Sequence, residues 1–174
     1  HNVDLDNTII THESGSSREY TVPFWEARAP RSFIGWGKST QLGYSLGLAM
    51  GAKLAAPEKQ VFNVMGDAAF GMSGLDIETS ARSGVPITTI VLNNGGMATY
   101  PGGFPTAREV YGVSHMYGDY AKIAEGMGAV GITVTKTSEI APAIKSAQKL
   151  NADGKTVLLD IHTRFEDRRS PRDS

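Results

Sequence analysis

The sequence has 174 residues, with 17 basic and 18 acidic side chains, four histidines and no cysteine. A chain of this length can bury about 70% of its unfolded surface in one core, so a single layered α/β domain is expected, and the lack of cysteine excludes disulfides and thiolate metal sites. The balanced charge argues against binding to nucleic acid or to an anionic membrane. No apolar run approaches the roughly twenty residues that are needed to cross a bilayer. Because the sequence has no signal-like start, a cytoplasmic location is expected.

The first predicted strand is the β-branched run of residues 8–11, which leads into Glu13 and the small residues 14–17. A strand that ends in glycine and small hydroxyl residues can present backbone amides to a phosphate group. The same composition is also typical of a serine-rich surface turn. Residues 20–31 contain aromatic residues and prolines without a clear period, which predicts an irregular segment.

Residues 35–40 read Gly-Trp-Gly-Lys-Ser-Thr, which invites comparison with a phosphate-binding P-loop. A P-loop needs another glycine five positions before Gly37, and that position is Ser32, so a nucleotide triphosphatase is not predicted. The next run, residues 42–54, is predicted to be a buried helix. Gly43, Gly47 and Gly51 recur on one face of it, which predicts close packing on the sheet or on a partner.

The central stretch is a predicted strand, helix and strand at residues 61–65, 73–82 and 87–92. A connection of this kind makes the two strands parallel, so both strand ends lie at the same edge of the sheet. The first strand stops at Asp67 and the second at Asn94. Carboxylate and amide oxygens are ligands that Mg²⁺ prefers, although each residue taken singly is also typical of an ordinary turn.

The rest of the chain is predicted to complete a doubly wound parallel sheet with helices on both faces. Residues 95–105 form a glycine-rich loop of a length that is often functional or mobile. Helices are predicted at residues 119–127 and 138–150, and strands at 131–135 and 156–161. The domain is predicted to occupy residues 1–163, followed by a flexible tail, residues 164–174. Because the chain begins at His1 and not at Met, a longer polypeptide is expected.

Two motifs in the middle of the chain resemble the thiamine-diphosphate enzymes. Their signature, Gly-Asp-Gly and later Asn-Asn, is similar to Gly66-Asp67-Ala68 and Asn93-Asn94, with Ala68 replacing the usual glycine. Residues 40–52 resemble the family segment that passes beneath the cofactor, and residues 13–17 resemble Glu-Thr-Gly-Thr-Ser of the decarboxylase branch. The resemblance implies the thiamine-diphosphate-binding fold, in the C-terminal domain that holds the pyrophosphate.

The resemblance also implies a site. Mg²⁺ would be held by Asp67, Asn94 and the backbone carbonyl of Gly96. Leu42 would wedge under the cofactor between its two rings, and the carbonyl of Thr40 would accept a hydrogen bond from the aminopyrimidine. The residues that the resemblance assigns to cofactor binding are Gly15, Ser16, Thr40, Leu42, Gly66, Asp67, Ala68, Ala69, Asn94, Gly96 and Met97.

The function implied is that of an enzyme that makes or breaks a carbon–carbon bond next to a carbonyl, with thiamine diphosphate and Mg²⁺ as cofactors. An acetolactate-synthase-like enzyme that decarboxylates and ligates 2-oxo acids is favoured. Residues 69–79 also resemble the oxalyl-CoA decarboxylases and 2-hydroxyacyl-CoA lyases, which form the alternative. The catalytic glutamate is expected outside this chain, on a pyrimidine-binding domain or subunit, within a homo-oligomer (a dimer or tetramer).

An alternative outside the enzymes is a non-catalytic module that binds a dinucleotide or a nucleotide. Such a module needs a Gly-x-Gly-x-x-Gly turn after its first strand. Residues 13–18, Glu-Ser-Gly-Ser-Ser-Arg, do not supply that turn.

Overall fold

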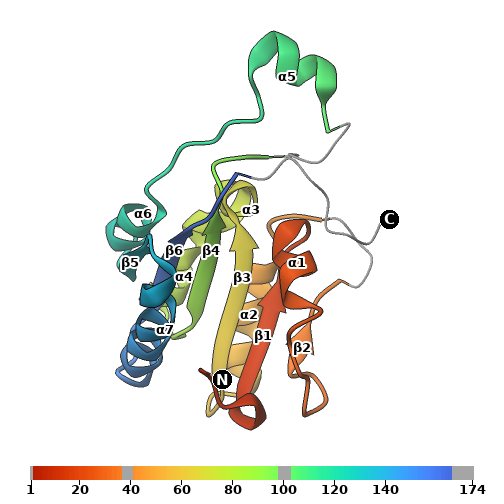
Figure 1. Ribbon diagram of the computed structural model, residues 1–174. Helices are drawn as coiled ribbons and strands as arrows, with labels where there is room; N and C mark the ends of the chain where they lie inside the picture. Colours follow the sequence, from red (N-terminus) through yellow and green to blue (C-terminus); the bar gives the residue numbers. More distant parts are fainter. Residues whose placement is uncertain (1, 37–40, 98–102, 166–174) are drawn as a thin grey trace.

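A computed structural model describes residues 2–36, 41–97 and 103–165. Within these residues, six strands form one parallel sheet in the order β2-β1-β3-β4-β6-β5, drawn as arrows in Figure 1. The strands are β1 (Thr8–His12), β2 (Phe33–Ile34), β3 (Gln60–Gly66), β4 (Thr88–Asn93), β5 (Val130–Val134) and β6 (Val157–His162). The helices are η1 (Leu5–Asn7), α1 (Ser16–Thr21), α2 (Ser45–Ala55), α3 (Asp67–Ser73), η2 (Gly74–Asp76), α4 (Ile77–Arg82), α5 (Pro105–Tyr111), α6 (Tyr120–Gly126) and α7 (Thr137–Ala152).

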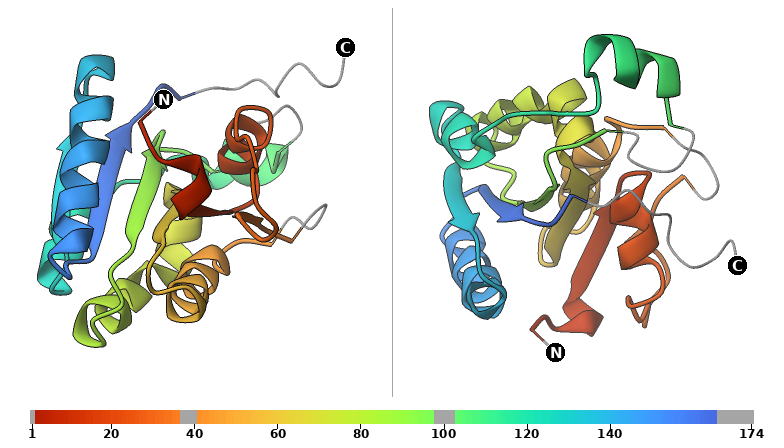
Figure 2. Two further views of the ribbon diagram at one scale, coloured as in Figure 1. Left: turned by 90° about the horizontal axis from the view of Figure 1, so that it is seen from below. Right: turned by 45° about the horizontal axis from the view of Figure 1, so that its top comes forward.

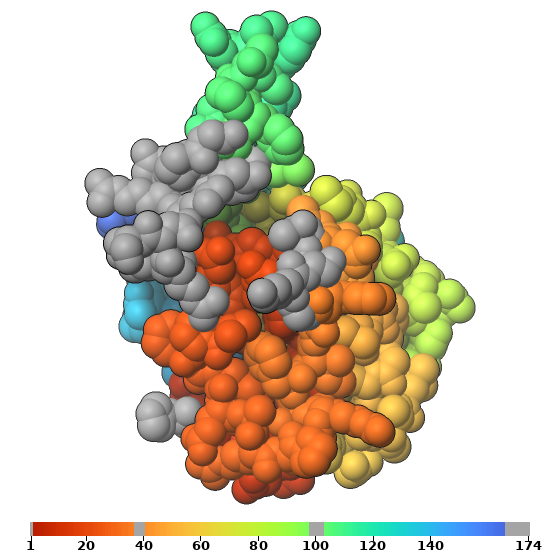
Figure 3. Space-filling model, turned by 90° about the vertical axis from the view of Figure 1, so that its right-hand side faces the viewer, coloured from red at the N-terminus to blue at the C-terminus, as the bar shows by residue number. Residues whose placement is uncertain are grey.

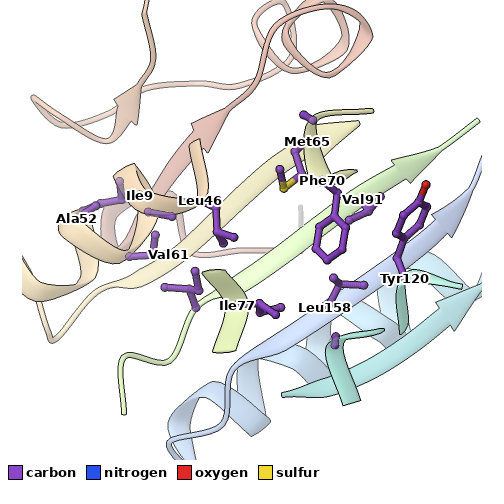
Figure 4. Packing of buried hydrophobic residues seen from close by; sticks show 14 residues of the cluster. Ile9, Leu46, Ala52, Val61, Met65, Phe70, Ile77, Val91, Tyr120 and Leu158 are labelled. Carbon is purple, nitrogen blue, oxygen red and sulfur yellow. The ribbon is translucent and has the colours of Figure 1, made fainter. Parts of the chain in front are cut away.

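The predicted fold class is confirmed, because helices cover both faces of an all-parallel sheet (Figure 2). One face packs against α2, α3, α4 and α6, and the other packs mainly against α7. Successive side chains of a strand point to opposite faces, so Ile9 joins the first cluster whereas Ile10 joins a cluster on the second face. Figure 4 shows the first cluster, in which Leu46, Phe70 and Leu158 are buried together.

The strand order places two reversals of direction in the sheet. The chain leaves β1 on one side to form β2 and then crosses back through α2 to β3, on the other side of β1. Later the chain passes from β4 to the edge strand β5 and returns through α7 to β6, which lies between them. In open parallel sheets, ligands bind outside the carboxyl ends of strands next to such reversals. This rule directs attention to the loops that follow β1, β3 and β4.

Several predicted helices differ from those in the structure. The helix predicted at residues 73–82 starts six residues earlier, at Asp67, and is interrupted by η2 before α4. Two short helices were not predicted: α1 begins inside the predicted serine-rich turn, and α5 begins at Pro105, the last residue of the predicted glycine-rich loop. Both are short, with 6 and 7 residues, so they span too few turns to produce a helical period in the sequence.

The glycine stripe on α2 does not pack on the sheet. Gly47 and Gly51 are exposed, and a Cβ atom added at either would meet no atom within 4 Å. The expectation of close packing on the sheet is therefore wrong at these two positions, and Ala49 and Ala52 face the core instead. Packing of the stripe on a partner stays a prediction.

Helix α5 stands clear of the body of the molecule, beyond the carboxyl edge of the sheet (Figures 1 and 3). None of its residues is buried. Large apolar side chains on and around it are exposed: Phe104, Val110, Tyr111, Val113 and Tyr117. An exposed apolar group of this kind is typical of a surface that contacts another domain or subunit.

Candidate functional site

The loops after β3 and β4 meet at the carboxyl edge of the sheet. The strands are direct neighbours, and Gly66 at the end of β3 pairs with Leu92 near the end of β4. Asp67 starts α3 immediately after β3, and Asn94 follows β4 directly. The two polar residues predicted from the sequence therefore lie at the same edge, as expected.

The carboxylate of Asp67 links the two loops. Its Oδ2 accepts a hydrogen bond from the amide of Gly95 at 2.8 Å, and its Oδ1 accepts one from the amide of Ala68 at 2.8 Å. The residue is 2% exposed, and this burial raises the pKa of the carboxyl, although the amide hydrogen bonds oppose the shift. Burial thus makes the negative charge costly, and a cation bound beside it would offset that cost.

The two asparagines at the end of β4, Asn93 and Asn94, have different hydrogen-bond partners. Asn94 accepts a hydrogen bond from the amide of Gly96 through its Oδ1 at 3.0 Å, which closes the turn. Asn93 donates through Nδ2 to the buried carboxylate of Asp160 at 3.0 Å. The first asparagine therefore anchors the loop to β6, and the second has its amide oxygen at the turn next to Asp67.

The start of the predicted glycine-rich loop is held by pairing with a later segment. Met97 donates its amide to the carbonyl of Ser114 at 3.0 Å, and Met116 donates to the carbonyl of Gly95 at 3.0 Å. Gly96 and His115 thereby form an antiparallel bridge. No sequence pattern predicts this pairing, which fixes Gly96, the predicted carbonyl ligand.

Those of the remaining predicted site residues that the structure describes lie around the same edge of the sheet. Gly15 and Ser16 are exposed at the start of α1, just after β1. Leu42 is half-buried in the segment before α2 and packs against the core cluster. Thr40 lies outside the described residues. The roles assigned to these residues, and to Gly66, Ala68, Ala69 and Met97, stay predictions.

The donor set fits a hard divalent cation. A carboxylate offers about four lone-pair sites and an amide oxygen two, so Asp67 and Asn94 retain free acceptor positions after the hydrogen bonds described above. A Cβ atom at Gly66 would meet no atom within 4 Å outside its two chain neighbours, so the backbone just before Asp67 leaves room for a ligand. The described residues contain no group of three or more histidine, aspartate or glutamate side chains that could hold a metal ion. A cation here would therefore depend on amide, carbonyl and phosphate oxygens as well, as Mg²⁺ does.

Two buried acids that the sequence did not mark as important also lie at this edge. Glu13 accepts hydrogen bonds from the amides of Gly43 and Ser45, and Asp160 accepts one from the amide of Tyr120 as well as that from Asn93. The sequence pointed to Glu13 only as the first residue of the segment that resembles Glu-Thr-Gly-Thr-Ser, and to Asp160 only as an interruption of the apolar run that forms β6.

Tyr120 gives a testable pH effect. Burial, with the nearby charges of Asp67 and Asp160, raises the pKa of its phenol to about 12. An unfolded tyrosine ionises near pH 10, so between about pH 10 and 12 the folded domain binds more protons than the unfolded chain and its stability falls as pH rises. The variant Tyr120→Phe is expected to lose this part of the alkaline destabilisation. Urea unfolding at several pH values checks it; an equally steep fall in the variant would contradict the assignment.

The fold and the arrangement of loops define an α/β domain with its polar groups gathered at the carboxyl edge of a parallel sheet, the architecture of cofactor-binding domains. Residues 13–161 match the family described as thiamine pyrophosphate enzyme, C-terminal TPP binding domain. The chain belongs to this family and is its thiamine-diphosphate-binding domain. The nucleotide-binding module of another class is thereby set aside.

Individual relatives agree with the family. The chain is 30% identical to the acetolactate synthase large subunit of Corynebacterium glutamicum over 84% of this chain and 24% of that protein. It is also 30% identical to 2-hydroxyacyl-CoA lyase 2 of Mus musculus, over 90% of this chain and 25% of that protein. The structure resembles a thiamine diphosphate-dependent 4-hydroxybenzoylformate decarboxylase of Rhodococcus jostii with a TM-score of 0.78 and 27% identity, over 93% of this chain and 30% of that one.

The chain thus spans about a quarter of the length of the curated relatives that it matches. Among the helices of the described residues, none combines the length and the apolar character needed to cross a membrane.

Proposed function

We propose that this domain anchors thiamine diphosphate through Mg²⁺ in an enzyme that decarboxylates 2-oxo acids and ligates the products, in the manner of acetolactate synthase. The single observation that carries the proposal is the hydrogen bond between Asp67 Oδ2 and the amide of Gly95, because it joins the two loops that bear the expected metal ligands. The acetolactate synthases among the relatives support the reaction class.

Each residue of the site has a role in this proposal. Asp67, Asn94 and the carbonyl of Gly96 hold Mg²⁺, which neutralises the diphosphate. The amide of Ala69, in the first turn of α3, has no carbonyl partner within the helix and can donate to a phosphate oxygen. The amide of Ala68 donates to Asp67 Oδ1, so it would serve a phosphate only by sharing or leaving that bond. Ala68 lies in a helical conformation and is not among the residues with positive φ, so its methyl group is tolerated where the family has glycine.

Gly15, Ser16, Leu42 and Met97 complete the proposed site, together with Thr40. Gly15 and Ser16 are exposed at the end of β1, where small residues let a ligand approach the backbone. Leu42 supplies an apolar support under the cofactor. When bound, thiamine diphosphate supplies the electron sink for breaking or forming the carbon–carbon bond, and this domain fixes its position.

Calorimetry tests the proposal on the complete protein. Thiamine diphosphate is expected to bind in the presence of Mg²⁺ and to bind much more weakly after the metal is chelated, whereas NAD is expected not to bind. Tight binding of thiamine diphosphate that is unchanged by chelation would contradict the role given to Mg²⁺. No binding under either condition would contradict the cofactor assignment to these residues.

One alternative reaction is supported by a specific observation. The similarity to 2-hydroxyacyl-CoA lyase 2 favours an acyl-CoA lyase as the second candidate. Turnover of pyruvate against a 2-hydroxyacyl-CoA thioester separates the two candidates. Cleavage of the thioester substrate without consumption of pyruvate would overturn the acetolactate-synthase-like proposal and favour the lyase.

A partner is part of the proposal. The activating glutamate would come from a pyrimidine-binding domain or subunit, within a dimer or tetramer. The exposed apolar side chains of residues 104–117 support such a contact, because they lie beyond the edge that carries the site. Full turnover by residues 1–174 alone would contradict the need for this partner.

A further inference from the structure

Glu13 is a fully buried acid outside the set of expected cofactor ligands. Its side chain has 0% exposure. Oε1 accepts a hydrogen bond from the amide of Ser45 at 2.7 Å, and Oε2 accepts one from the amide of Gly43 at 3.0 Å. Burying a charged carboxylate is costly unless its oxygens are paired, so these two amides explain how the residue is accommodated.

The two amides belong to the segment that leads into α2. Ser45 is the first residue of this helix, and Tyr44, its N-cap, provides no side-chain cap. Gly43 has a φ of 86°, in the left-handed region, and a Cβ atom there would lie 3.4 Å from Cβ of Met72. The hydroxyl of Tyr44 donates to the carbonyl of His12 at 2.6 Å. The end of β1 thus holds this bend at three successive residues.

The pattern of hydrogen bonds exceeds what a helix cap requires. A cap would need only the amides inside the first turn of the helix, of which Ser45 is one. The second oxygen of Glu13 binds Gly43, which lies outside the helix and directly follows Leu42. The carboxylate therefore fixes the backbone on the side of the segment that carries Leu42.

We propose that Glu13 is a positioning residue: by holding the amides of Gly43 and Ser45, its buried carboxylate sets the position of Leu42, the residue that would support the cofactor. This inference rests on the proposed function of Leu42. Because it is fully buried, Glu13 itself would not touch the cofactor. Its effect passes through the two amides and the left-handed bend at Gly43.

The variant Glu13→Gln in the complete protein tests the proposal. Glutamine keeps the shape of the side chain but turns one acceptor into a donor that faces an amide N–H. Because hydrogen bonds to a charged group are among the stronger ones, the affinity for thiamine diphosphate with Mg²⁺ is expected to fall about tenfold or more in calorimetry. The apparent KM of the Glu13→Gln variant for thiamine diphosphate is expected to rise by a similar factor.

Ser80→Ala is the matched control. Its buried hydroxyl contacts the carbonyl of Val85 at 2.6 Å and the hydroxyl of Thr156 at 2.7 Å, away from the expected site. This variant is expected to melt at a lower temperature while it binds the cofactor like the unchanged protein. Unchanged affinity in Glu13→Gln, or an equal loss in Ser80→Ala, would overturn the proposal.

Tyr44→Phe covers the case in which Glu13→Gln does not fold. It removes one hydroxyl tether of the same bend and leaves the buried carboxylate in place, so a smaller loss of affinity, about threefold, is expected. Unchanged affinity in Tyr44→Phe would then overturn the proposal. If the unchanged protein does not bind thiamine diphosphate, the proposed function is overturned as well. If the unchanged protein binds it and the variants bind it equally well, only the role proposed for Glu13 is overturned.

Discussion

Replacing Asp67 by alanine is expected to abolish measurable binding of Mg²⁺ and thiamine diphosphate. Changes in groups that only support a metal ligand lower metal affinity by about 10- to 100-fold, so loss of the carboxylate ligand itself is expected to cost more than about 100-fold. Calorimetry of the complete protein with both ligands measures the effect. Binding within a few-fold of the unchanged protein would remove Asp67 from the site.

The Asp67→Ala variant also needs a test of folding. It leaves the amides of Ala68 and Gly95 without their acceptor, and each unpaired buried amide costs about 1–3 kcal/mol. Asp67→Asn keeps one acceptor and the shape of the side chain, so it is expected to fold better and still to bind Mg²⁺ poorly. Asp76→Ala is the control, because Asp76 is an exposed acid on the same helical segment. It is expected to bind both ligands normally.

Replacing Gly131 by alanine is expected to give the largest loss of stability. A Cβ atom at this position would lie 2.2 Å from the carbonyl oxygen of Ala121, in the backbone of α6. Neither the strand nor the helix can yield by rotating a side chain, so β5 and α6 must move apart. Overpacking of this kind costs about 3 kcal/mol or more, which corresponds to a fall in melting temperature of roughly 10 °C.

Gly126→Ala is the matched control for Gly131→Ala. Gly126 is the last residue of the same helix, and a Cβ atom there would meet no atom within 4 Å. Its φ is not in the positive range, so alanine is expected to be neutral or to stabilise by up to about 1 kcal/mol. Equal melting temperatures for the two variants would show that β5 and α6 do not approach as closely as described.

The sequence predicted the central strands of the sheet and the polar residues at their carboxyl ends. The strands at residues 61–65 and 87–92 lie within one residue of β3 and β4 at each end. Such apolar runs are local signals, and the glycine, aspartate and asparagine residues that end them are local as well. Parallel connection then places both strand ends together, so the sequence pattern suffices to assign Asp67 and Asn94 to one edge of the sheet.

Other parts of the site could not be predicted, because they depend on residues far apart in the sequence. Glu13 meets Ser45 across 32 positions, and Asp160 meets Asn93 across 67. A buried acid looks the same in a sequence as an exposed one until the fold decides which amides it meets. The same holds for Gly131, which reads as a weak strand residue and is in fact the point where α6 approaches the sheet.

Periodic apolar residues and turn residues thus determined the layers and the polar edge, since each depends on neighbours within a few positions. Only the tertiary structure decided which backbone groups the buried carboxylates of Glu13, Asp67 and Asp160 bind. The physical reason is that a carboxylate can be buried only where the fold brings donors to its oxygens, and the donors here come largely from other loops and helices.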